Sequence, residues 1–502
     1  MFLFIQQSPF VFSISVLLIW ILYKWIISKP RNKNNLPPSP WKLPVIGNLH
    51  QLGTSLHRSL LELSKKHGPL MMIHIGSMPM LVASSAKVAE KILKTHDLVF
   101  CSRPQLKIPN AFTYGSKDIA FSPYGEYWRQ IRSIAVLHLL SNKRVMSYRK
   151  VREEETALMI KEIGESRGSV VDVSELIVSF TNNVICRVAL GKTYPGLKFK
   201  NLLSRMMSLL GVLSMESYIP SLSWVDRLSG LNRRINEVSE ELDEFFEAVI
   251  EEHLIQRRET NDSFCGSDEG KDLVNILLDV QVENAGGFIV DKESIKAVIL
   301  DIFAAGTDTT STNIEWAVSE LVRHPRVMKK LQQEVTEKAN GKSMITEEDL
   351  DKMEYLKAVI KESLRFHVPL PLLVQRETTH DVKLMGYDIA ARTLVAINAW
   401  AVARDPSVWT EPEEFKPERF LNSSIDYKGL HYDFIPFGAG RRGCPGIQFA
   451  IVVNELALAN LVYKYDLALP DGKEGEELDM SEVFGITVHK KSPLLLVATP
   501  RF

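Results

Sequence analysis

The sequence predicts a mainly α-helical protein with small β-sheets, placed behind an N-terminal transmembrane helix. Long runs with helical periodicity cover residues 150–260, Ile295–Leu321, Leu350–Phe366 and Gln448–Tyr465. The strand patterns are few and short by comparison, at Leu70–Ile75, Met80–Val82 and residues 382–397. An almost wholly apolar run stands close to the N-terminus. These observations favour helices packed in layers, with strands in a minor role.

The composition is that of an ordinary folded protein. The chain has 502 residues, of which 45% are hydrophobic and 24% charged. Its net charge of −1 gives no bulk electrostatic reason to bind nucleic acid, so we expect no nucleic-acid partner. The four cysteines (Cys101, Cys186, Cys265 and Cys444) are widely spaced and form no CxxC pair. This spacing argues against a disulfide scaffold or a zinc site and fits a reducing compartment.

The apolar run Pro9–Ile27 carries a single charge, at Lys24. A helix of about 20 such residues spans the hydrocarbon layer of a bilayer. Trp20 and Trp25 suit the interface between lipid and water. The alternative is a cleaved signal peptide, which usually has a basic start and a small-residue cleavage site, and neither is present. We therefore predict a retained membrane anchor at residues 1–27.

The next segment, residues 28–44, is basic and rich in proline. Lys29, Arg31 and Lys33 follow the span, whereas residues 1–8 carry no charged side chain. By the positive-inside tendency, the rest of the chain (residues 45–502) lies on the cytosolic side. The run Leu36-Pro-Pro-Ser-Pro-Trp predicts a stiff, extended linker between the anchor and the globular body.

Several shorter elements are predicted in the body. Two strands, Leu70–Ile75 and Met80–Val82, surround a turn at Gly76–Pro79, and Ser85–His96 has helical spacing. Residues 101–125 contain several Pro, Gly and Ser residues with little periodicity, which indicates a loop region. Residues 382–397 predict strands with a turn at Gly386.

Trp128 and Arg132 are the next candidates for a binding role. They stand four residues apart and so share one face of a helix. An indole N–H and a guanidinium are both hydrogen-bond donors, and together they suit an anionic group. Taken alone, such a pair is more often a surface feature.

The long helix Ile295–Leu321 has an unusual centre, Ala304-Ala-Gly-Thr-Asp-Thr-Thr-Ser. Glycine and hydroxyl residues are poor helix formers, and hydroxyls that bond back to the preceding turn can bend a helix or open its hydrogen-bond ladder. We expect a local opening, with Gly306 allowing close approach of a bulky partner. Asp308 and Thr309 place an acid beside a hydroxyl, which suits proton transfer. The alternative is a polar stripe satisfied within the core.

Glu362 and Arg365 face the same way on the helix Leu350–Phe366 and can form a bidentate ion pair. Exposed pairs of this kind are common and contribute little to stability. From the spacing alone, a common exposed pair is the simpler interpretation.

The most informative stretch is Pro436–Gly446. Four glycines and two prolines in eleven residues predict tight turns. Pro445 suits the first turn of a new helix, which would put Cys444 at a helix N-terminus. Free N–H groups there stabilise a thiolate, the form that binds a metal. Arg442 adds a positive charge, and Phe437 can lie over a flat ligand. The alternative is a glycine-rich loop with an incidental buried thiol.

At these residues the sequence resembles the cytochrome P-450 superfamily of haem-thiolate proteins, most of all its plant microsomal type, the large family numbered seventy-one. The loop meets the family's spacing Phe-x-x-Gly-x-Arg-x-Cys-x-Gly in full, and five motifs follow in the family's order. The resemblance implies the cytochrome P-450 fold, with residues 45–502 as a single haem domain. It also implies heme b (iron protoporphyrin IX) with Cys444 as axial ligand, and a location on the endoplasmic reticulum membrane.

The resemblance assigns roles to particular residues. The haem would be held by Trp128, Arg132, Arg376, Phe437, Arg442 and Cys444, and protons would be delivered to dioxygen by Asp308 and Thr309. A structural network would be formed by Glu362, Arg365 and Arg419. An apolar substrate pocket would be lined by Phe112, Ala304, Ala305, Leu370, Val374 and Ile486. Many plant relatives have proline where this chain has Gln375, which leaves the position of Arg376 less defined. Arg441 is a candidate contact for a partner protein.

The implied activity is that of a monooxygenase. One atom of dioxygen would enter an apolar plant specialised metabolite such as a terpenoid, alkaloid or phenylpropanoid, and electrons would come from NADPH through NADPH–cytochrome P-450 reductase. Three alternatives stay open: an isomerase or dehydratase of the same fold, a haem-binding protein without turnover, and a membrane-anchored interaction protein without haem. The substrate, the position oxidised and the outcome of the oxidation stay open as well.

Overall fold

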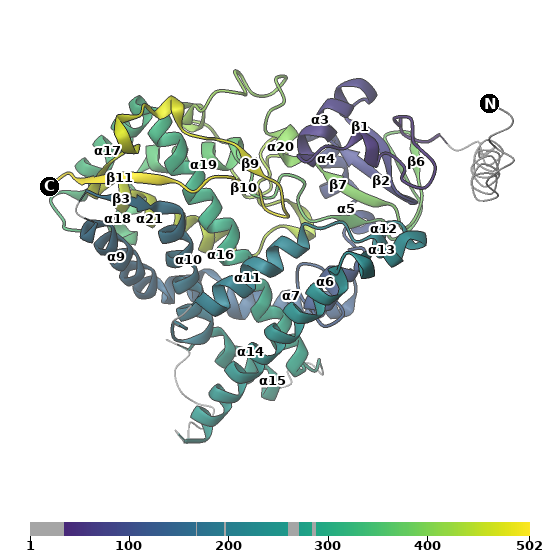
Figure 1. Ribbon diagram of the computed structural model, residues 1–502, viewed down its shortest axis with the longest axis horizontal. Coiled ribbons are helices and arrows are strands. Elements are labelled where there is room, and N and C mark those ends of the chain that lie inside the picture. The colour runs from purple at the N-terminus through teal and green to yellow at the C-terminus, as the bar shows by residue number, and fades with distance from the viewer. Residues whose placement is uncertain (1–34, 167, 195–196, 260–270, 284–287) are drawn as a thin grey trace, which may run out of the picture.

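The computed structural model describes residues 35–166, 168–194, 197–259, 271–283 and 288–502. The predicted membrane anchor, the first part of the linker and Cys265 lie outside the described residues. Within the described part, the expectation of a mainly helical protein with small sheets is confirmed (Figure 1). Two described helices, Val173–Leu190 and Ile447–Lys464, are long and apolar enough to cross a membrane. Both are mostly buried inside the protein, which identifies them as core helices.

The elements have the following bounds. The helices are α3 (Leu56–His67), α4 (Ala86–Glu90), α5 (Asp97–Phe100), α6 (Lys107–Phe112), α7 (Glu126–Ile134), α8 (Asn142–Ser147), α9 (Arg149–Glu165), α10 (Val173–Leu190), α11 (Leu197–Leu210), α12 (Met215–Tyr218), α13 (Ser223–Leu228), α14 (Leu231–Glu259), α15 (Leu273–Glu283), α16 (Lys292–Arg323), α17 (Pro325–Ala339), α18 (Glu347–Leu350), α19 (Glu354–Phe366), α20 (Ala399–Val402) and α21 (Ile447–Lys464). The strands are β1 (Leu70–Ile75), β2 (Met78–Ala83), β3 (Val170–Asp172), β4 (Arg376–Glu377), β5 (Val382–Leu384), β6 (Tyr387–Ile389), β7 (Leu394–Ile397), β8 (Tyr465–Ala468), β9 (Glu482–Val483), β10 (His489–Lys490) and β11 (Leu495–Pro500).

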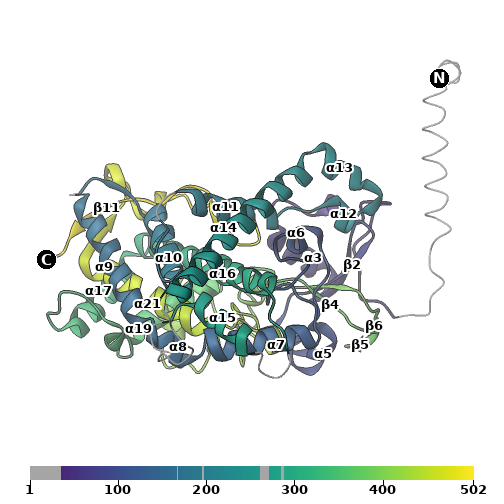
Figure 2. The same ribbon diagram turned by 90° about the horizontal axis from the view of Figure 1, so that it is seen from below.

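Helix α16 runs through the middle of the molecule, where α10, α19 and α21 pack against it (Figures 1 and 2). Its start is fixed by Asp291, whose side chain accepts a hydrogen bond from the N–H of Ser294 at 2.8 Å. It ends just before Pro325, because proline cannot continue the hydrogen-bond ladder of a helix. Residues on all sides of α16 are buried, as expected for a helix surrounded by other helices.

The largest sheet has the strand order β1–β2–β7–β4 and lies away from the helical body (Figure 1). Its β1–β2 hairpin pairs Leu70 with Ala83, and alternate residues of β1 enter apolar clusters on opposite faces of the sheet. Burial on both faces explains why β1 is apolar except at His74. The second strand begins at Met78, two residues earlier than predicted. Pro79 is tolerated there because pairing with β7 starts only at Met80.

One expectation for the body is wrong. Residues 101–125 are not loop throughout, because α6 occupies Lys107–Phe112. Pro109 was the misleading signal, since proline is tolerated in the first turn of a helix, where its missing N–H has no intrahelical partner. Phe112 is buried at 3% exposure in the helical core.

Candidate active site

A large cavity separates α16 from the cysteine loop, residues 436–446. It encloses about 1510 Å³ of empty space, part of it open to solvent. Ala305, Gly306 and Thr309 of α16 line one side. Cys444 and Phe437 line it as well, together with α21 residues that follow the loop. The cysteine and the threonine singled out in the sequence therefore face the same space, which is roomy enough for a flat cofactor and a small molecule.

The cysteine loop is held in shape by backbone hydrogen bonds and by glycine. The N–H of Cys444 donates to the carbonyl of Phe437 at 2.9 Å. Gly440 has φ +69°, and a Cβ at this position would lie 2.4 Å from the carbonyl oxygen of Leu93. Only glycine fits such a site. Helix α21 begins at Ile447, so Pro445 precedes the helix, whereas the sequence had predicted it within the first turn.

The surroundings of Cys444 act on the pKa of its thiol in opposite directions. Burial raises the pKa of its thiol, although the Gly446 N–H and the charge of Arg132 act in the opposite direction. A bound metal ion would supply positive charge that favours the thiolate over the thiol. No group of three or more His, Cys, Asp or Glu side chains suited to a metal ion exists among the described residues. A metal at Cys444 would thus need most of its ligands from a cofactor.

Arg442 is buried beside the cavity and donates hydrogen bonds to three backbone carbonyls. Its guanidinium donates to the oxygens of Cys101 at 2.7 Å, Ile119 at 3.2 Å and Ser122 at 2.6 Å. Burial lowers the pKa of Arg442 to about 9, and the nearby charge of Arg376 adds to the lowering. The carbonyls satisfy the N–H groups without cancelling the charge, so an anionic ligand would be stabilised here.

Arg103 is a cavity residue that the sequence reasoning missed. It donates to the carbonyls of Ala120 at 2.8 Å, Val374 at 2.5 Å and Gln375 at 2.7 Å. Burial lowers its pKa, as it does for Arg442. Arg103 lies in the segment read as irregular loop, where no periodicity distinguishes it from a surface arginine.

Four arginines in all line the cavity: Arg103, Arg132, Arg376 and Arg442. Among the described residues, Asp97 is the only carboxylate within 4 Å of any of them, at 3.4 Å from Arg376. Asp97 also pairs with Arg441, at 3.0 Å. This excess of buried positive charge fits a flat cofactor that carries carboxylates, such as the propionates of haem.

Trp128 and Arg132 reach the cavity, and each already donates one hydrogen bond to the backbone. The indole N–H of Trp128 donates to the carbonyl of Ile119 at 3.0 Å, and Arg132 donates to the carbonyl of Gly443. The Trp128 N–H therefore binds a backbone carbonyl in this structure, and its hydrogen bond to an anionic cofactor stays a prediction. The indole ring supports Arg442, whose guanidinium carbon lies 3.9 Å from the ring centroid.

The centre of α16 is not opened. The helix is unbroken from Lys292 to Arg323, which corrects the expected local unwinding. The hydroxyls do bond back to the preceding turn, as predicted: Thr309 Oγ1 donates to the carbonyl of Ala305 at 2.7 Å. Gly306 faces Ile185 of α10, and a Cβ there would lie 2.5 Å from Ile185 Cδ1.

Asp308 does not line the cavity. Successive residues on a helix point in different directions, so Asp308 does not face the cavity that the adjacent Thr309 lines. Its Oδ1 lies 3.3 Å from Nε2 of His489, whereas its Oδ2 is buried and has no hydrogen-bond partner among the described residues. His489 was not identified from the sequence.

The apolar residues predicted to meet substrate divide into two groups. Ala305, Leu370 and Val374 line the cavity. Phe112, Ala304 and Ile486 do not: the first packs in the core, the second lies against the core, and the third sits in a half-buried turn. Ile185, Ile302 and Leu373 line the cavity without having been predicted.

The ion-pair network predicted behind the site is present. Arg365 donates to both oxygens of Glu362, at 2.7 and 2.8 Å, and Arg419 Nε donates to Glu362 at 3.1 Å. Glu362 and Arg365 are fully buried. The pair is therefore a buried one, and not the exposed surface pair that the spacing alone allows.

Gln375 does not disturb its surroundings. Its side-chain oxygen accepts a hydrogen bond from the hydroxyl of Tyr218 at 3.0 Å, and Arg376 next to it is buried and lines the cavity. The departure from the familiar proline is therefore accommodated by one hydrogen bond to α12.

A lone cysteine and a helix threonine facing one cavity, with buried arginines around it, define a haem-thiolate protein. The family model for cytochrome P-450 matches residues 37–497. This chain belongs to the cytochrome P-450 family.

Known relatives extend this result. The chain is 54% identical over 98% of its length to a 3-beta-hydroxylase of Tanacetum parthenium, covering 97% of that protein. It is 51% identical to norfluorocurarine oxidase of a Strychnos species, and the match covers 97% of this chain and 98% of that protein. It is 50% identical to psoralen synthase of Ammi majus, and the match covers 99% of each chain. A zebra fish cytochrome P-450 solved with abiraterone shares the fold, with a TM-score of 0.76, 24% identity and coverage of 89% and 100% of the two chains.

Proposed function

We propose that this protein is a monooxygenase that binds heme b through Cys444 and oxidises an apolar plant specialised metabolite, with electrons from NADPH through a partner reductase. The observation that carries the proposal is the single cavity shared by Cys444 and Thr309. The relatives named above as a hydroxylase, an alkaloid oxidase and a psoralen synthase support it.

The residues around the cavity suit this cofactor. Cys444 Sγ would bind the haem iron, and Arg103, Arg132, Arg376 and Arg442 would hold the propionates. Phe437 lines the cavity near the cysteine, where it can contact the ring. When bound, the haem supplies reductive activation of dioxygen, with one oxygen atom entering the substrate and the other leaving as water.

Protons for this reaction would pass through α16. Thr309 Oγ1 faces the cavity and is held by the Ala305 carbonyl, so it can order water close to the site of reaction. Asp308 is the neighbouring acid and would hand protons to the Thr309 side through rotation of its side chain. Acid and hydroxyl together supply protons while keeping bulk water out.

The substrate would lie against the apolar wall formed by Ile302, Ala305, Leu370 and Val374. This lining favours a compound with a large hydrocarbon surface, of terpenoid, alkaloid or phenylpropanoid type. The arginines of the cavity are assigned to the cofactor, which leaves the apolar wall to contact the substrate.

The proposal includes the arrangement of the whole chain. Residues 1–27 would anchor it in the endoplasmic reticulum membrane, residues 28–44 would act as a linker, and residues 45–502 would form the catalytic domain on the cytosolic side. Arg441, about half exposed beside the cysteine loop, is a candidate contact for the reductase.

The test uses the full chain expressed in microsomes together with a plant reductase. We expect a carbon monoxide difference spectrum of the thiolate type, shifts of the haem absorption band with apolar plant metabolites, and turnover that requires NADPH. Turnover without NADPH would instead show an isomerase or dehydratase. A haem spectrum without turnover of any compound that shifts it would indicate a binding protein, and a pigment-free protein would overturn the proposal altogether.

A further inference from the structure

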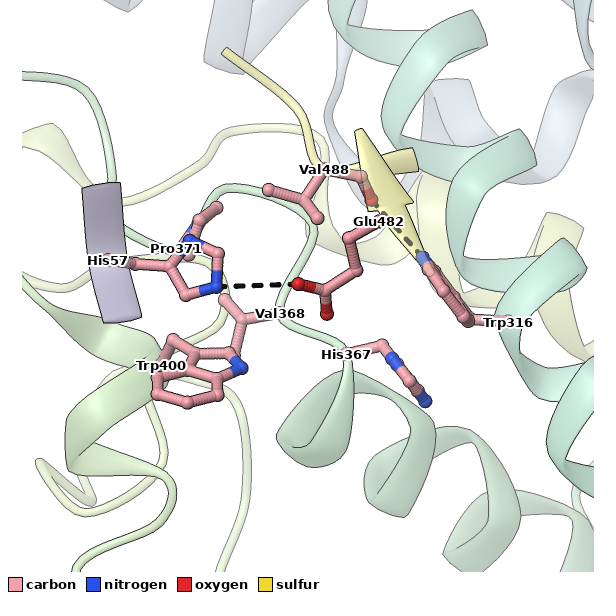
Figure 3. Close-up of a pocket in the computed structure, with 8 residues that line it drawn as sticks. All are labelled: His57, Trp316, His367, Val368, Pro371, Trp400, Glu482 and Val488. Atoms are coloured by element: carbon pink, nitrogen blue, oxygen red, sulfur yellow. Dashed lines mark hydrogen bonds and ion pairs between the residues drawn. The ribbon is translucent and has the colours of Figure 1, made fainter. Parts of the chain in front are cut away.

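The hairpin of β9 and β10 brings residues 482–490 against α16. Its position is fixed at several points around a small buried cavity, shown in Figure 3. Arg58 donates to Glu482 at 2.9 Å, and His57 faces the same carboxylate. Trp316 of α16 donates to the carbonyl of Val488 at 3.1 Å. The residue that follows, His489, is therefore held at a defined place beside the helix.

Both ring nitrogens of His489 meet α16. Nδ1 lies 2.9 Å from Thr312 Oγ1, and Nε2 lies 3.3 Å from Asp308 Oδ1. Asp308 and Thr312 are four residues apart and share one face of the helix. The imidazole thus spans one turn of α16, on the side turned away from the cavity.

The hydrogen bonds restrict where the protons are. Thr312 Oγ1 donates its single hydrogen to the carbonyl of Asp308 at 2.7 Å, so it accepts from His489 Nδ1–H. With that tautomer, the contact between Nε2 and Asp308 is attractive only when a proton lies between them. The pair therefore holds one proton, either as an imidazolium with a carboxylate or as two neutral groups.

The charges around His489 favour the proton-bearing state. Burial lowers the pKa of His489, but the hydrogen bond and charge of Asp308 outweigh it and leave the pKa above its usual value, with Glu315 adding to the rise. Lys490 on the same strand and Glu482 on β9 are the other charged groups of the hairpin. A proton is therefore stored here close to neutral pH.

The two partners differ in their access to water. The side chain of His489 is 38% exposed, whereas that of Asp308 is 17% exposed and keeps Oδ2 buried and unpartnered. One end of the pair can exchange protons with solvent, and the other adjoins Thr309 at the cavity. Proton transfer through the pair can therefore run from solvent, through His489, to Asp308.

We propose that His489 is the positioning residue that supplies protons to Asp308 from the solvent side. Its Nε2–H bond breaks as the proton passes to Asp308 Oδ1, Asp308 releases a proton toward Thr309, and a solvent water returns a proton to Nε2. No electrons move in these steps. The inference rests on the proposed function, because it requires Asp308 to serve the cavity.

The first test needs no turnover. Histidine-labelled holoenzyme is titrated by NMR, as wild type and as Asp308→Asn. We expect the pKa of His489 to fall by about one unit when the carboxylate is removed, following the loss of one close ionic partner. An unchanged pKa would overturn the inference. His380→Gln is the matched control, because His380 is exposed and binds only its neighbour Thr379.

The second test measures hydrogen peroxide released per NADPH consumed by holoenzyme with reductase, without added substrate, from pH 6 to 9. In the wild type we expect the peroxide share to rise as His489 loses its proton. In His489→Gln it should be roughly threefold higher at pH 6 and independent of pH, consistent with loss of a general acid. His489→Arg keeps the positive charge but cannot release a proton, so it should behave like His489→Gln.

The outcomes separate this inference from the proposed function. Wild-type behaviour of His489→Arg would mean that charge alone positions Asp308, which overturns proton supply by His489. If His489→Gln matches the wild type while Asp308→Asn raises the peroxide share, the inference fails and the proposed function stands. If Asp308→Asn and Thr309→Ala also match the wild type, the proposed relay itself fails.

Discussion

The guanidinium carbon of Arg442 lies 3.9 Å from the centroid of the Trp128 indole ring. The two side chains also share an acceptor, because the carbonyl of Ile119 receives hydrogen bonds from both. Arg442 is thus fixed by a ring on one side and by carbonyls along its edge. A charge held in this way is ready for an anionic ligand before that ligand binds.

Arg442→Lys should lower haem content and stability. Lysine cannot reproduce a flat fork of donors to three carbonyls, and it stacks poorly on an indole ring. We expect a loss of about 2–3 kcal/mol, measured by chemical unfolding, and a lower ratio of haem to protein absorbance. Arg441→Lys is the control, since Arg441 is half exposed. Equal haem content in the two variants would contradict this account.

Gly440→Ala should prevent formation of the haem site. The added Cβ would meet the Leu93 carbonyl at 2.4 Å, and backbone atoms cannot move aside as a side chain can. Gly472→Ala is a matched control, because Gly472 has the same φ of +69° with nothing within 4 Å of its Cβ position. That control should cost only about 1–2 kcal/mol. The carbon monoxide spectrum distinguishes the two, and its survival in Gly440→Ala would refute the argument.

The sequence was informative wherever local spacing decides the structure. The cysteine loop, the back-bonding Thr309 and the Glu362–Arg365 pair are all set by residues a few positions apart, and each is found where the pattern indicated. The short apolar runs Leu70–Ile75 and Met80–Val82, around a turn, likewise predicted the β1–β2 hairpin. Sequence periodicity reflects local backbone geometry, and at these positions the folded protein keeps that geometry.

The sequence was uninformative wherever distant segments meet. His489 contacts Asp308 across 181 positions of chain, and Arg103 reaches Val374 across 271. Neither contact has a local pattern. The same limit applies to the hydrogen bond from Trp128 to the Ile119 carbonyl, because Ile119 lies in an irregular segment whose path is determined by tertiary packing.

Thr309→Ala should separate consumption of NADPH from formation of product. The hydroxyl faces the cavity, and its loss removes the group that orders water there. We expect more hydrogen peroxide per NADPH and an unchanged carbon monoxide spectrum. Thr307→Ala is the control, since Thr307 is buried but does not line the cavity. A similar peroxide yield in both variants would remove the basis for assigning Thr309 a role.

Gly306→Ala should destabilise the protein through one contact with α10. Alanine favours a helix over glycine by about 1 kcal/mol, but its Cβ would lie 2.5 Å from Ile185 Cδ1, and overpacking costs about 1–3 kcal/mol. Ile185→Val removes that carbon. In a double-mutant cycle, the variant with both changes should therefore have a higher free energy of unfolding than the sum of the two single changes predicts. Additive free energies of unfolding would show that the contact is not the cause.

Glu362→Gln should be among the most damaging substitutions outside the cavity. The carboxylate is the acidic partner of both Arg365 and Arg419, and it is fully buried. Removing it leaves positive charge in the interior without compensation, which costs about 3–5 kcal/mol.

Glu418→Gln gives the contrast for this prediction. Glu418 also pairs with a basic residue, Lys330, but both side chains are more than 40% exposed. An exposed pair contributes about 0–1 kcal/mol, because water solvates either charge once its partner is gone. Should Glu362→Gln fail to fold, Glu362→Asp keeps the charge while shortening the side chain and should fall between the two. If the free energies of unfolding of Glu362→Gln and Glu418→Gln differed by less than about 1 kcal/mol, burial of the Glu362 ion pairs would not contribute to stability.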